Sequence, residues 1–77
     1  MKLGQALILI RTAKELNQED LAAALSVSKS HICEVEKEKK NPSLDFLKSY
    51  ADLLKVPVSS IFRLAERLAV EPLFFLD

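Results

Sequence analysis

The chain reads LNQEDLAAALSVSKSHICEVEKEKKNPSLDFLKSYADLLKVPVSSIF over residues 16–62, and this stretch decides the fold. Within it, Asn17, Ser28 and Ser43 each stand just before a run of apolar residues at helical spacing. Such side chains accept hydrogen bonds from the free amide groups at the start of a helix. The stretch therefore predicts three consecutive helices, over residues 18–25, 29–37 and 44–54.

The sequence on either side of this stretch adds one helix at each end. An apolar face at helical spacing predicts a helix over residues 2–15, and Ile8 and Leu9 give that helix a second apolar side. A last helix is predicted to begin near Pro57, because proline is tolerated in the first helical turn, and to end at Pro72.

Composition agrees with a helical fold. Hydrophobic residues make up 49% of the 77 positions, and one glycine and three prolines are too few for a fold of strands and turns. The sequence predicts one all-α domain over residues 1–77. Its expected core includes Leu3, Leu7, Ile10, Leu21, Ala22, Leu25, Ile32, Val35, Leu44, Leu47, Ala51 and Leu54.

Charge and cysteine content exclude several kinds of site. Eleven basic and eleven acidic residues give zero net charge, which counts against nucleic-acid binding, although the local clustering of charge decides the field that DNA meets. Cys33 is the only cysteine, so one chain cannot form a disulfide framework. His31 lies two positions before Cys33 and does not share its helix face, so no metal site is expected.

We also expect no enzyme, no cofactor and no small-molecule ligand. The chain has no glycine-rich phosphate loop, and the paired acids Glu19 and Asp20 are explained by their place at a helix start. The apolar run at residues 5–10 is far too short to span a bilayer, and no signal-peptide cleavage site follows it. A cytoplasmic protein without a membrane anchor is expected.

The helices predicted over residues 18–25 and 29–37 form a compact pair, because a turn of three residues separates them. In a DNA-binding helix-turn-helix, the second helix of such a pair enters the major groove. Its outward residues must then be polar and long enough to reach the bases. The second helix here begins SKSH over residues 28–31, whereas Ile32 and Val35 face the core.

These residues resemble the Cro/repressor-like (XRE) family of helix-turn-helix domains. The resemblance covers residues 3–62 and leaves residues 63–77 as a helix extension and an apolar tail. It rests on Asn17-Gln18, Ala22, Ile32, Glu36, Asn41-Pro42-Ser43-Leu44 and Val56-Pro57. It implies a compact five-helix, lambda-repressor-like fold and a sequence-specific transcription regulator, a repressor or controller protein, that binds double-stranded DNA. The alternative is a protein-interaction module of the same fold that has lost DNA binding.

The resemblance also implies roles for single residues. It assigns base contacts to Ser28, Lys29, Ser30, Glu34 and Lys37. It assigns contacts with the DNA backbone to Asn17, Gln18, Lys39, Lys40, Asn41, Ser43 and Leu44, and Gln18 also braces the helix over residues 29–37. Arg11 and Glu36 match a family pair that forms an ion pair between the first and third helices. Taken alone, the lysines of residues 37–40 are better explained by an ordinary solvated charge run, whereas the resemblance to the family favours phosphate contact.

The sequence departs from the family at three helix ends. Glu15, Ser26 and Glu38 stand where the family often has glycine in a left-handed conformation. A non-glycine residue in that conformation costs roughly 1 kcal/mol or more. The helix ends are therefore expected to be rebuilt, which would change the angle of the groove helix.

The C-terminal part predicts a symmetric homodimer. Ile61, Leu64, Ala65 and Leu68 form an apolar stripe, and the tail adds more apolar area than a chain of 77 residues easily buries. Ile8 and Leu9 are candidates to receive the tail; burial within the chain and a disordered end are the alternatives. The expected interface consists of Ile61, Leu64, Leu68, Leu73, Phe74, Phe75 and Leu76.

Overall fold

The computed structural model describes residues 2–70 and contains five α-helices, with no strand in that range. They are α1 (Leu3–Ala13), α2 (Gln18–Leu25), α3 (Lys29–Glu36), α4 (Leu44–Leu54) and α5 (Val58–Val70). The predicted five-helix fold is confirmed. The bounds of α2 and α4 are those predicted from the sequence, whereas α1 is shorter at both ends and α3 ends one residue earlier. No helix within residues 2–70 is long and apolar enough to cross a membrane.

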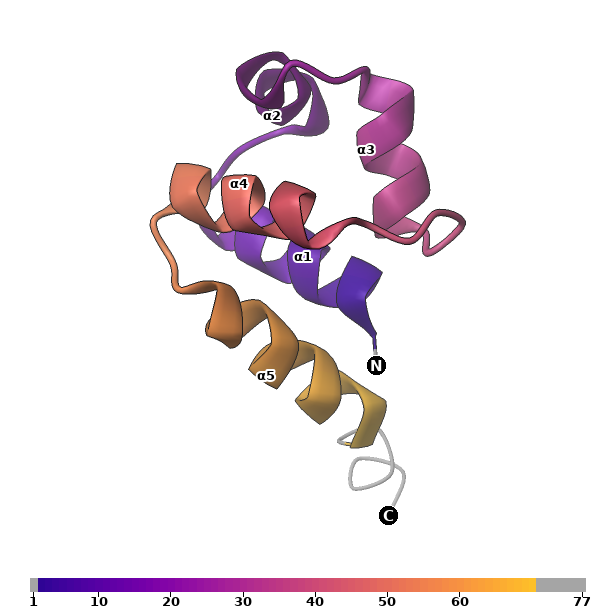
Figure 1. The fold of residues 1–77 in the computed structure, drawn as a ribbon, viewed down its shortest axis with the longest axis vertical. Helices are drawn as coiled ribbons and strands as arrows, with labels where there is room; N and C mark the ends of the chain where they lie inside the picture. Colours follow the sequence, from indigo (N-terminus) through magenta and orange to yellow (C-terminus); the bar gives the residue numbers. More distant parts are fainter. Residues whose placement is uncertain (1, 71–77) are drawn as a thin grey trace.

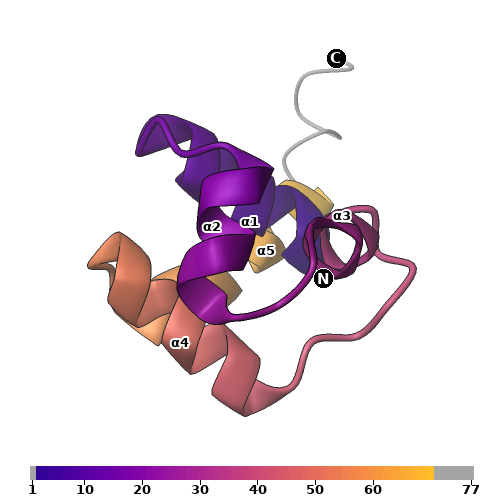
Figure 2. The ribbon, with the colours of Figure 1, turned by 90° about the horizontal axis from the view of Figure 1, so that it is seen from above.

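The helices are arranged in three levels along the long axis (Figure 1). α1 and α4 cross the middle of the molecule, α2 and α3 lie at one end, and α5 lies at the other end. Seen from above, α2 crosses over α1, and α3 stands beside the start of α1 (Figure 2). This arrangement leaves α3 with one side on the bundle and one side facing solvent.

Three side chains start helices as the sequence predicts. Asn17 Oδ1 accepts a hydrogen bond from the Asp20 amide at 2.7 Å, and Ser28 Oγ accepts one from the His31 amide at 3.0 Å. Ser43 Oγ accepts from the Phe46 amide at 3.1 Å. Each bond satisfies an amide that has no partner inside its helix. The starts of α2, α3 and α4 are therefore encoded locally.

The helix ends keep their left-handed residues without glycine. Glu15, Ser26 and Glu38 have φ angles of 59°, 58° and 61°, and Lys55 after α4 adds a fourth at 59°. Ser26 and Lys55 close their helices by donating their amides to carbonyls three and four residues back. The expectation that these helix ends are rebuilt is wrong. All three residues keep the left-handed conformation and its strain.

Twelve apolar side chains form the core, and most of them were predicted. They are Ala6, Leu7, Leu21, Ala22, Ile32, Val35, Leu47, Tyr50, Ala51, Leu54, Ile61 and Ala65. Leu3, Ile10 and Leu25 were also expected inside, and they are only partly buried at its edge.

The prediction that Leu44 belongs to the core is wrong, because 54% of its surface is exposed. Phe46 anchors the first turn of α4 instead, packing edge-on against the ring of His31 with centroids 5.3 Å apart. Two positions along a helix correspond to about 200° of rotation. Burying Phe46 therefore turns Leu44 outward.

The expected role of Ile61 in a dimer interface is also wrong, because Ile61 is fully buried in its own chain, as is Ala65. Both belong to the face of α5 that packs on the bundle. Leu64 and Leu68 are partly buried, so part of each side chain stays accessible. Four interface candidates, Leu73, Phe74, Phe75 and Leu76, lie outside the described residues.

The single glycine brings α1 close to the end of α3. Gly4 is buried, and a Cβ atom placed there would overlap the Glu36 carbonyl oxygen and lie 2.6 Å from Glu38 Cγ. No side chain fits this approach. Gly4 therefore helps to fix the position of α3, which carries the candidate site.

Candidate nucleic-acid interface

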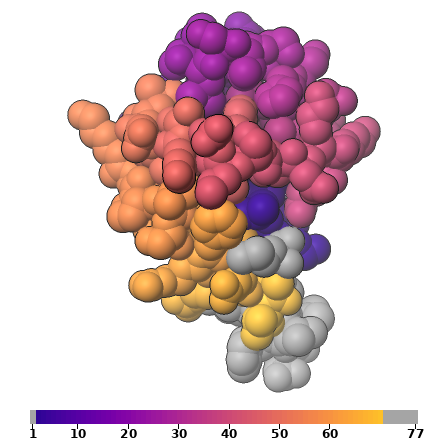
Figure 3. Space-filling model, in the orientation of Figure 1, coloured from indigo at the N-terminus to yellow at the C-terminus, as the bar shows by residue number. Residues whose placement is uncertain are grey.

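The outer side of α3 carries a row of polar side chains. Ile32 and Val35 are buried, with at most 2% of their surface exposed, so they hold the inner side of the helix on the core. The predicted base-contact residues are all exposed: Ser28, Lys29, Ser30, Glu34 and Lys37. In the space-filling view, α2 and α3 together form one end of the molecule (Figure 3). The predicted burial of Ile32 and Val35 and the predicted exposure of the other five side chains are confirmed.

Part of this row lines a shallow hollow of about 360 Å³. Ser30, Glu34 and Lys37 meet there with Lys39, which follows α3. Cys33, which is partly buried, completes the lining. The structure thus brings three candidate base-contact residues together with one candidate phosphate contact. Lys29 does not line this hollow and lies on the side of α3 toward α2.

Two ion pairs cross the polar face. Lys29 Nζ lies 3.4 Å from Glu19 Oε1 on α2, and Lys40 Nζ lies 3.7 Å from Glu34 Oε1. All four side chains are about half exposed or more. Exposed pairs of this kind contribute about 0–1 kcal/mol, so either lysine can leave its partner for a phosphate. Sequence reasoning missed the place of Glu19 on this face, because no spacing rule links residues of two different helices.

The candidate backbone contacts gather around two helix starts. Asn17 and Gln18 begin α2, Ser43 caps α4, and Leu44 is its first residue. Helix starts carry partial positive charge and free amides, which suit an anion. The remaining candidates are exposed in the connection from α3 to α4: Lys39, Lys40 and Asn41.

Neither His31 nor Cys33 is placed for metal chemistry. His31 packs on Phe46, and Cys33 is partly buried in the hollow, where Glu34 supplies the one carboxylate of the lining. Within residues 2–70, no group of three or more His, Cys, Asp or Glu side chains could hold a metal ion.

A buried carboxylate on the core side of α3 fixes the position of the helix. Glu36 is 3% exposed and forms a two-point ion pair with Arg11, with Nε–Oε2 at 2.7 Å and Nη2–Oε1 at 3.1 Å. The predicted pair between α1 and α3 is confirmed. The hydrogen bond from Arg11 to Glu36 also raises the pKa of Arg11, although burial opposes that effect, so the guanidinium stays charged.

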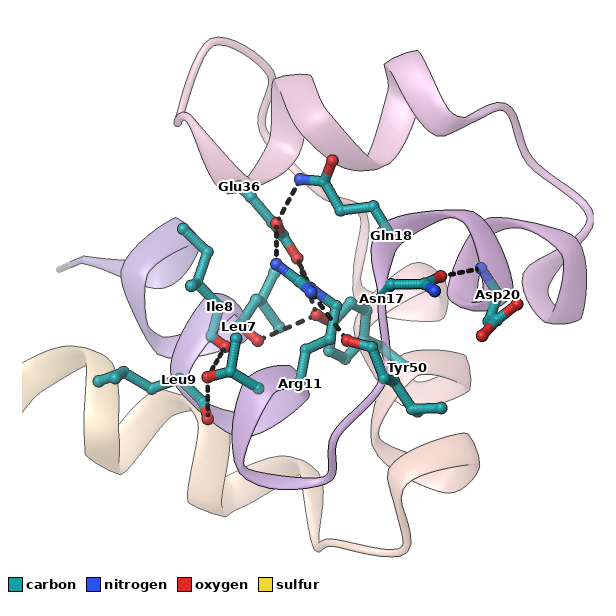
Figure 4. Close-up of polar contacts among 11 residues, drawn as sticks. Leu7, Ile8, Leu9, Arg11, Asn17, Gln18, Asp20, Glu36 and Tyr50 are labelled. Carbon is teal, nitrogen blue, oxygen red and sulfur yellow. Dashed lines mark hydrogen bonds and ion pairs between the residues drawn. The ribbon is translucent and has the colours of Figure 1, made fainter.

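Two more side chains converge on Glu36 (Figure 4). Gln18 Nε2 donates to Oε1 at 2.8 Å, which confirms that Gln18 braces α3. The Tyr50 hydroxyl oxygen lies 3.2 Å from Glu36 Oε2 and 3.0 Å from the Leu7 carbonyl oxygen, and its single hydrogen is donated between these two acceptors. Side chains from α1, α2 and α4 therefore hold one residue of α3. Sequence reasoning missed Tyr50. The available signal was its position three residues after Leu47, on the core side of α4. A tyrosine buried there needs a hydrogen-bond partner for its hydroxyl.

Tyr50 makes the fold sensitive to alkaline pH. Burial first, and then the charge of Glu36 and the hydrogen bond to it, raise the pKa of Tyr50 well above its usual value. The folded state therefore holds this proton where the unfolded state releases it, and stability is lost as the pH rises above about 10. Because Tyr50 is the only tyrosine, the ultraviolet absorbance of phenolate reports on it alone. We expect phenolate to appear only together with loss of helical circular dichroism.

The variant Tyr50→Phe is the control for this titration. It should lose the absorbance change, and any unfolding that remains at alkaline pH does not come from Tyr50. Gradual ionisation of Tyr50 near pH 10 with an intact circular dichroism spectrum would contradict the prediction.

Comparison with known proteins independently supports the interpretation of α2 and α3 as a helix-turn-helix. A sequence model of the helix-turn-helix family matches residues 7–61. The immunity repressor protein of Bacillus phage phi105 is 36% identical over 61 residues, which are 79% of this chain and 42% of that protein. The chain therefore spans less than half the length of this relative.

A solved structure is similar as well. The crystal structure of the restriction-modification controller protein C.AhdI from Aeromonas hydrophila superposes with a TM-score of 0.74 at 35% sequence identity. The match covers 78% of this chain and 91% of that one. Sequence, fold and the arrangement of α2 and α3 agree: the chain belongs to the helix-turn-helix family of Cro/repressor-like (XRE-type) proteins.

Proposed function

We propose that this chain is a sequence-specific transcription regulator, a repressor or controller protein, that binds double-stranded DNA and reads the major groove with α3. The observation that carries the proposal is the exposed polar row of α3, which Glu36 and its partners hold in a fixed position. The relatives support it, since one is named an immunity repressor and another a restriction-modification controller protein. The proposal includes no catalytic step, cofactor or small-molecule ligand.

Within this function, α3 and the helix starts have different tasks. We assign base contacts to Ser28, Lys29, Ser30, Glu34 and Lys37. We assign phosphate contacts to Asn17, Gln18, Lys39, Lys40, Asn41 and the start of α4 at Ser43 and Leu44. The side-chain oxygens of three of these residues already accept a capping hydrogen bond: Asn17, Ser28 and Ser43. In a DNA contact, these side chains would therefore donate a hydrogen bond to the DNA.

In-vitro selection of DNA sites, followed by two lysine variants, tests the proposal. Lys29→Ala should change the preferred base at one position and cost about 1–3 kcal/mol in binding. Lys40→Ala should weaken all sequences alike and reduce the slope of log affinity against log salt by about one, because a phosphate contact carries no sequence information. Equal effects of both variants on every sequence would refute this division of roles.

We also propose that the chain acts as a homodimer through α5 and the tail. α5 lies at the end of the molecule opposite α2 and α3, so a contact there leaves α3 free (Figure 1). Leu64 and Leu68 are partly accessible, and Ile8 and Leu9 line an apolar hollow of about 210 Å³ on α1. Two recognition helices related by a dyad would read a pseudo-palindromic operator with half-sites about 34 Å apart.

Removal of residues 73–77 should convert the dimer to a monomer and make DNA binding steeply dependent on protein concentration. The reason is the loss of four large apolar side chains from the proposed contact. Sedimentation measures the assembly, and removal of Asp77 alone is the control, since it deletes no apolar side chain. A full-length monomer at micromolar concentration, or a truncated chain that stays dimeric, would contradict this interface.

One observation favours a second candidate, a protein-interaction module of the same fold. The net charge is zero, and the acids Glu19 and Glu34 pair with Lys29 and Lys40 on the face proposed for DNA. Gel shifts with duplex DNA at low and high salt separate the two functions. A regulator binds at low salt and loses affinity as salt rises, whereas an interaction module shows little binding at either salt concentration.

A further inference from the structure

We propose that Glu34 is a specificity-determining residue that makes tight binding conditional on a C·G base pair at one position of each operator half-site. The inference rests on the proposed function and goes beyond it by naming the base pair. Glu34 lies on the outer side of α3 in the C-terminal half of the helix, and its side chain is about half exposed. It lines the same hollow as Lys37, one helical turn further along.

A carboxylate can only accept hydrogen bonds, and this restricts which base it tolerates. In the major groove, cytosine presents the donor N4–H₂, guanine presents the acceptors N7 and O6, and thymine presents the acceptor O4 and a methyl group. Adenine sets its donor beside an acceptor. Cytosine is therefore the base that satisfies Glu34 without placing an acceptor against it.

The neighbour of Glu34 strengthens this choice. Lys37 has only donors, and it lines the hollow from the same helix face. A C·G pair offers a donor on one base and two acceptors on the other, side by side in the groove. The Glu34 carboxylate and the Lys37 ammonium together match that pattern in sign, since the first accepts and the second donates. An A·T pair sets its single donor between two acceptors, so it suits the Glu34 carboxylate less well.

Lys40 decides how the Glu34 carboxylate is paired in the free protein. There, Lys40 Nζ lies 3.7 Å from Glu34 Oε1 and partly neutralises it. When Lys40 turns to a phosphate, Glu34 loses this counter-charge on every duplex, so the loss lowers the affinity for all sequences alike. Discrimination arises in the complex, where a cytosine amino group donates to the carboxylate, whereas guanine and thymine place acceptors against it. This repulsion penalises binding to other sequences and gives a near-neutral protein selectivity.

In-vitro selection with the full chain tests the inference, using wild type, Glu34→Gln and the control Glu66→Gln. Glu66 is exposed on α5, so its variant has the same change in net charge at a distance from α3. Wild type should enrich C·G at one position per half-site. Glu34→Gln should lose this preference or turn to adenine, which glutamine reads. Discrimination at that position should fall about 5- to 150-fold, while affinity for random duplex rises. Glu66→Gln should keep the wild-type preference.

Four outcomes would overturn the inference or its basis, and they are distinguishable. A wild-type operator without an enriched C·G pair, or a Glu34→Gln variant that keeps the wild-type preference, overturns the role of Glu34. Equal gains in random-duplex affinity for Glu34→Gln and Glu66→Gln show an effect of net charge alone and overturn the local repulsion assigned to Glu34. If wild type enriches no duplex at all, the proposed function itself has failed.

Discussion

The variant Glu36→Gln is expected to lower the free energy of unfolding by about 3–5 kcal/mol, because it leaves the partly buried Arg11 charge without a counter-charge. Glu36 is 3% exposed and accepts hydrogen bonds from Arg11, Gln18 and Tyr50. The glutamine amide would point donors toward groups that are themselves donors. Urea unfolding followed by circular dichroism measures the change.

Glu34→Gln is the matched control, since it makes the same chemical change two residues earlier on the same helix. The Glu34 side chain is 48% exposed, and its pair with Lys40 is screened by water, so its loss should change stability by less than about 1 kcal/mol. A second control, Arg11→Met combined with Glu36→Gln, should cost less than the sum of its parts, because it removes both charges. An unchanged urea midpoint for Glu36→Gln would show that the buried pair contributes nothing.

The second large effect concerns the four left-handed residues. Replacement of Glu15, Ser26, Glu38 and Lys55 by glycine should raise the free energy of unfolding by roughly 2–4 kcal/mol in total. The left-handed conformation costs each of these side chains about 1–2 kcal/mol. Glycine removes this cost, but about half of the gain is lost because glycine gives the unfolded chain greater freedom. The four sites lie at four different helix ends, so their effects should add.

Thermal unfolding measures this effect well. For a domain of this size, each kcal/mol shifts Tm by about 4–8 °C, so the combined variant should melt roughly 10–30 °C higher. Ala23→Gly is the control, because Ala23 is exposed inside α2 with ordinary helical geometry. It should lower stability by about 1 kcal/mol. If all four glycines lower Tm as Ala23→Gly does, the positive φ angles carry no strain.

The strain of the four left-handed residues lies at the helix ends and not within the candidate recognition helix. In a small domain with a free energy of unfolding of only a few kcal/mol, a strain of this size is a large fraction of the total. The cost is spread over the ends of α1, α2, α3 and α4, while the buried ion pair of Arg11 and Glu36 holds α3 itself. The structure thus combines strained helix ends with a firmly held candidate recognition helix.

The sequence by itself determined the helices and the two faces of α3. Asn17, Ser28 and Ser43 cap their helices through bonds to amides three residues ahead, and such contacts are local enough to read from the sequence. The spacing of Ile32 and Val35 likewise shows which side of α3 is buried. The pairing of Arg11 with Glu36 came from the resemblance to the family, because no spacing rule spans 25 residues.

The tertiary structure alone decided what lies opposite each face. Periodicity placed Leu44 and Ile61 on apolar stripes, yet one is exposed and the other is fully buried in its own chain. It gave no sign that Tyr50 bonds to Glu36, or that Glu19 reaches Lys29 from another helix. The physical reason is that periodicity fixes the direction of a side chain around its own helix axis. Burial and pairing depend on which other helix packs there, and that is set by the whole chain at once.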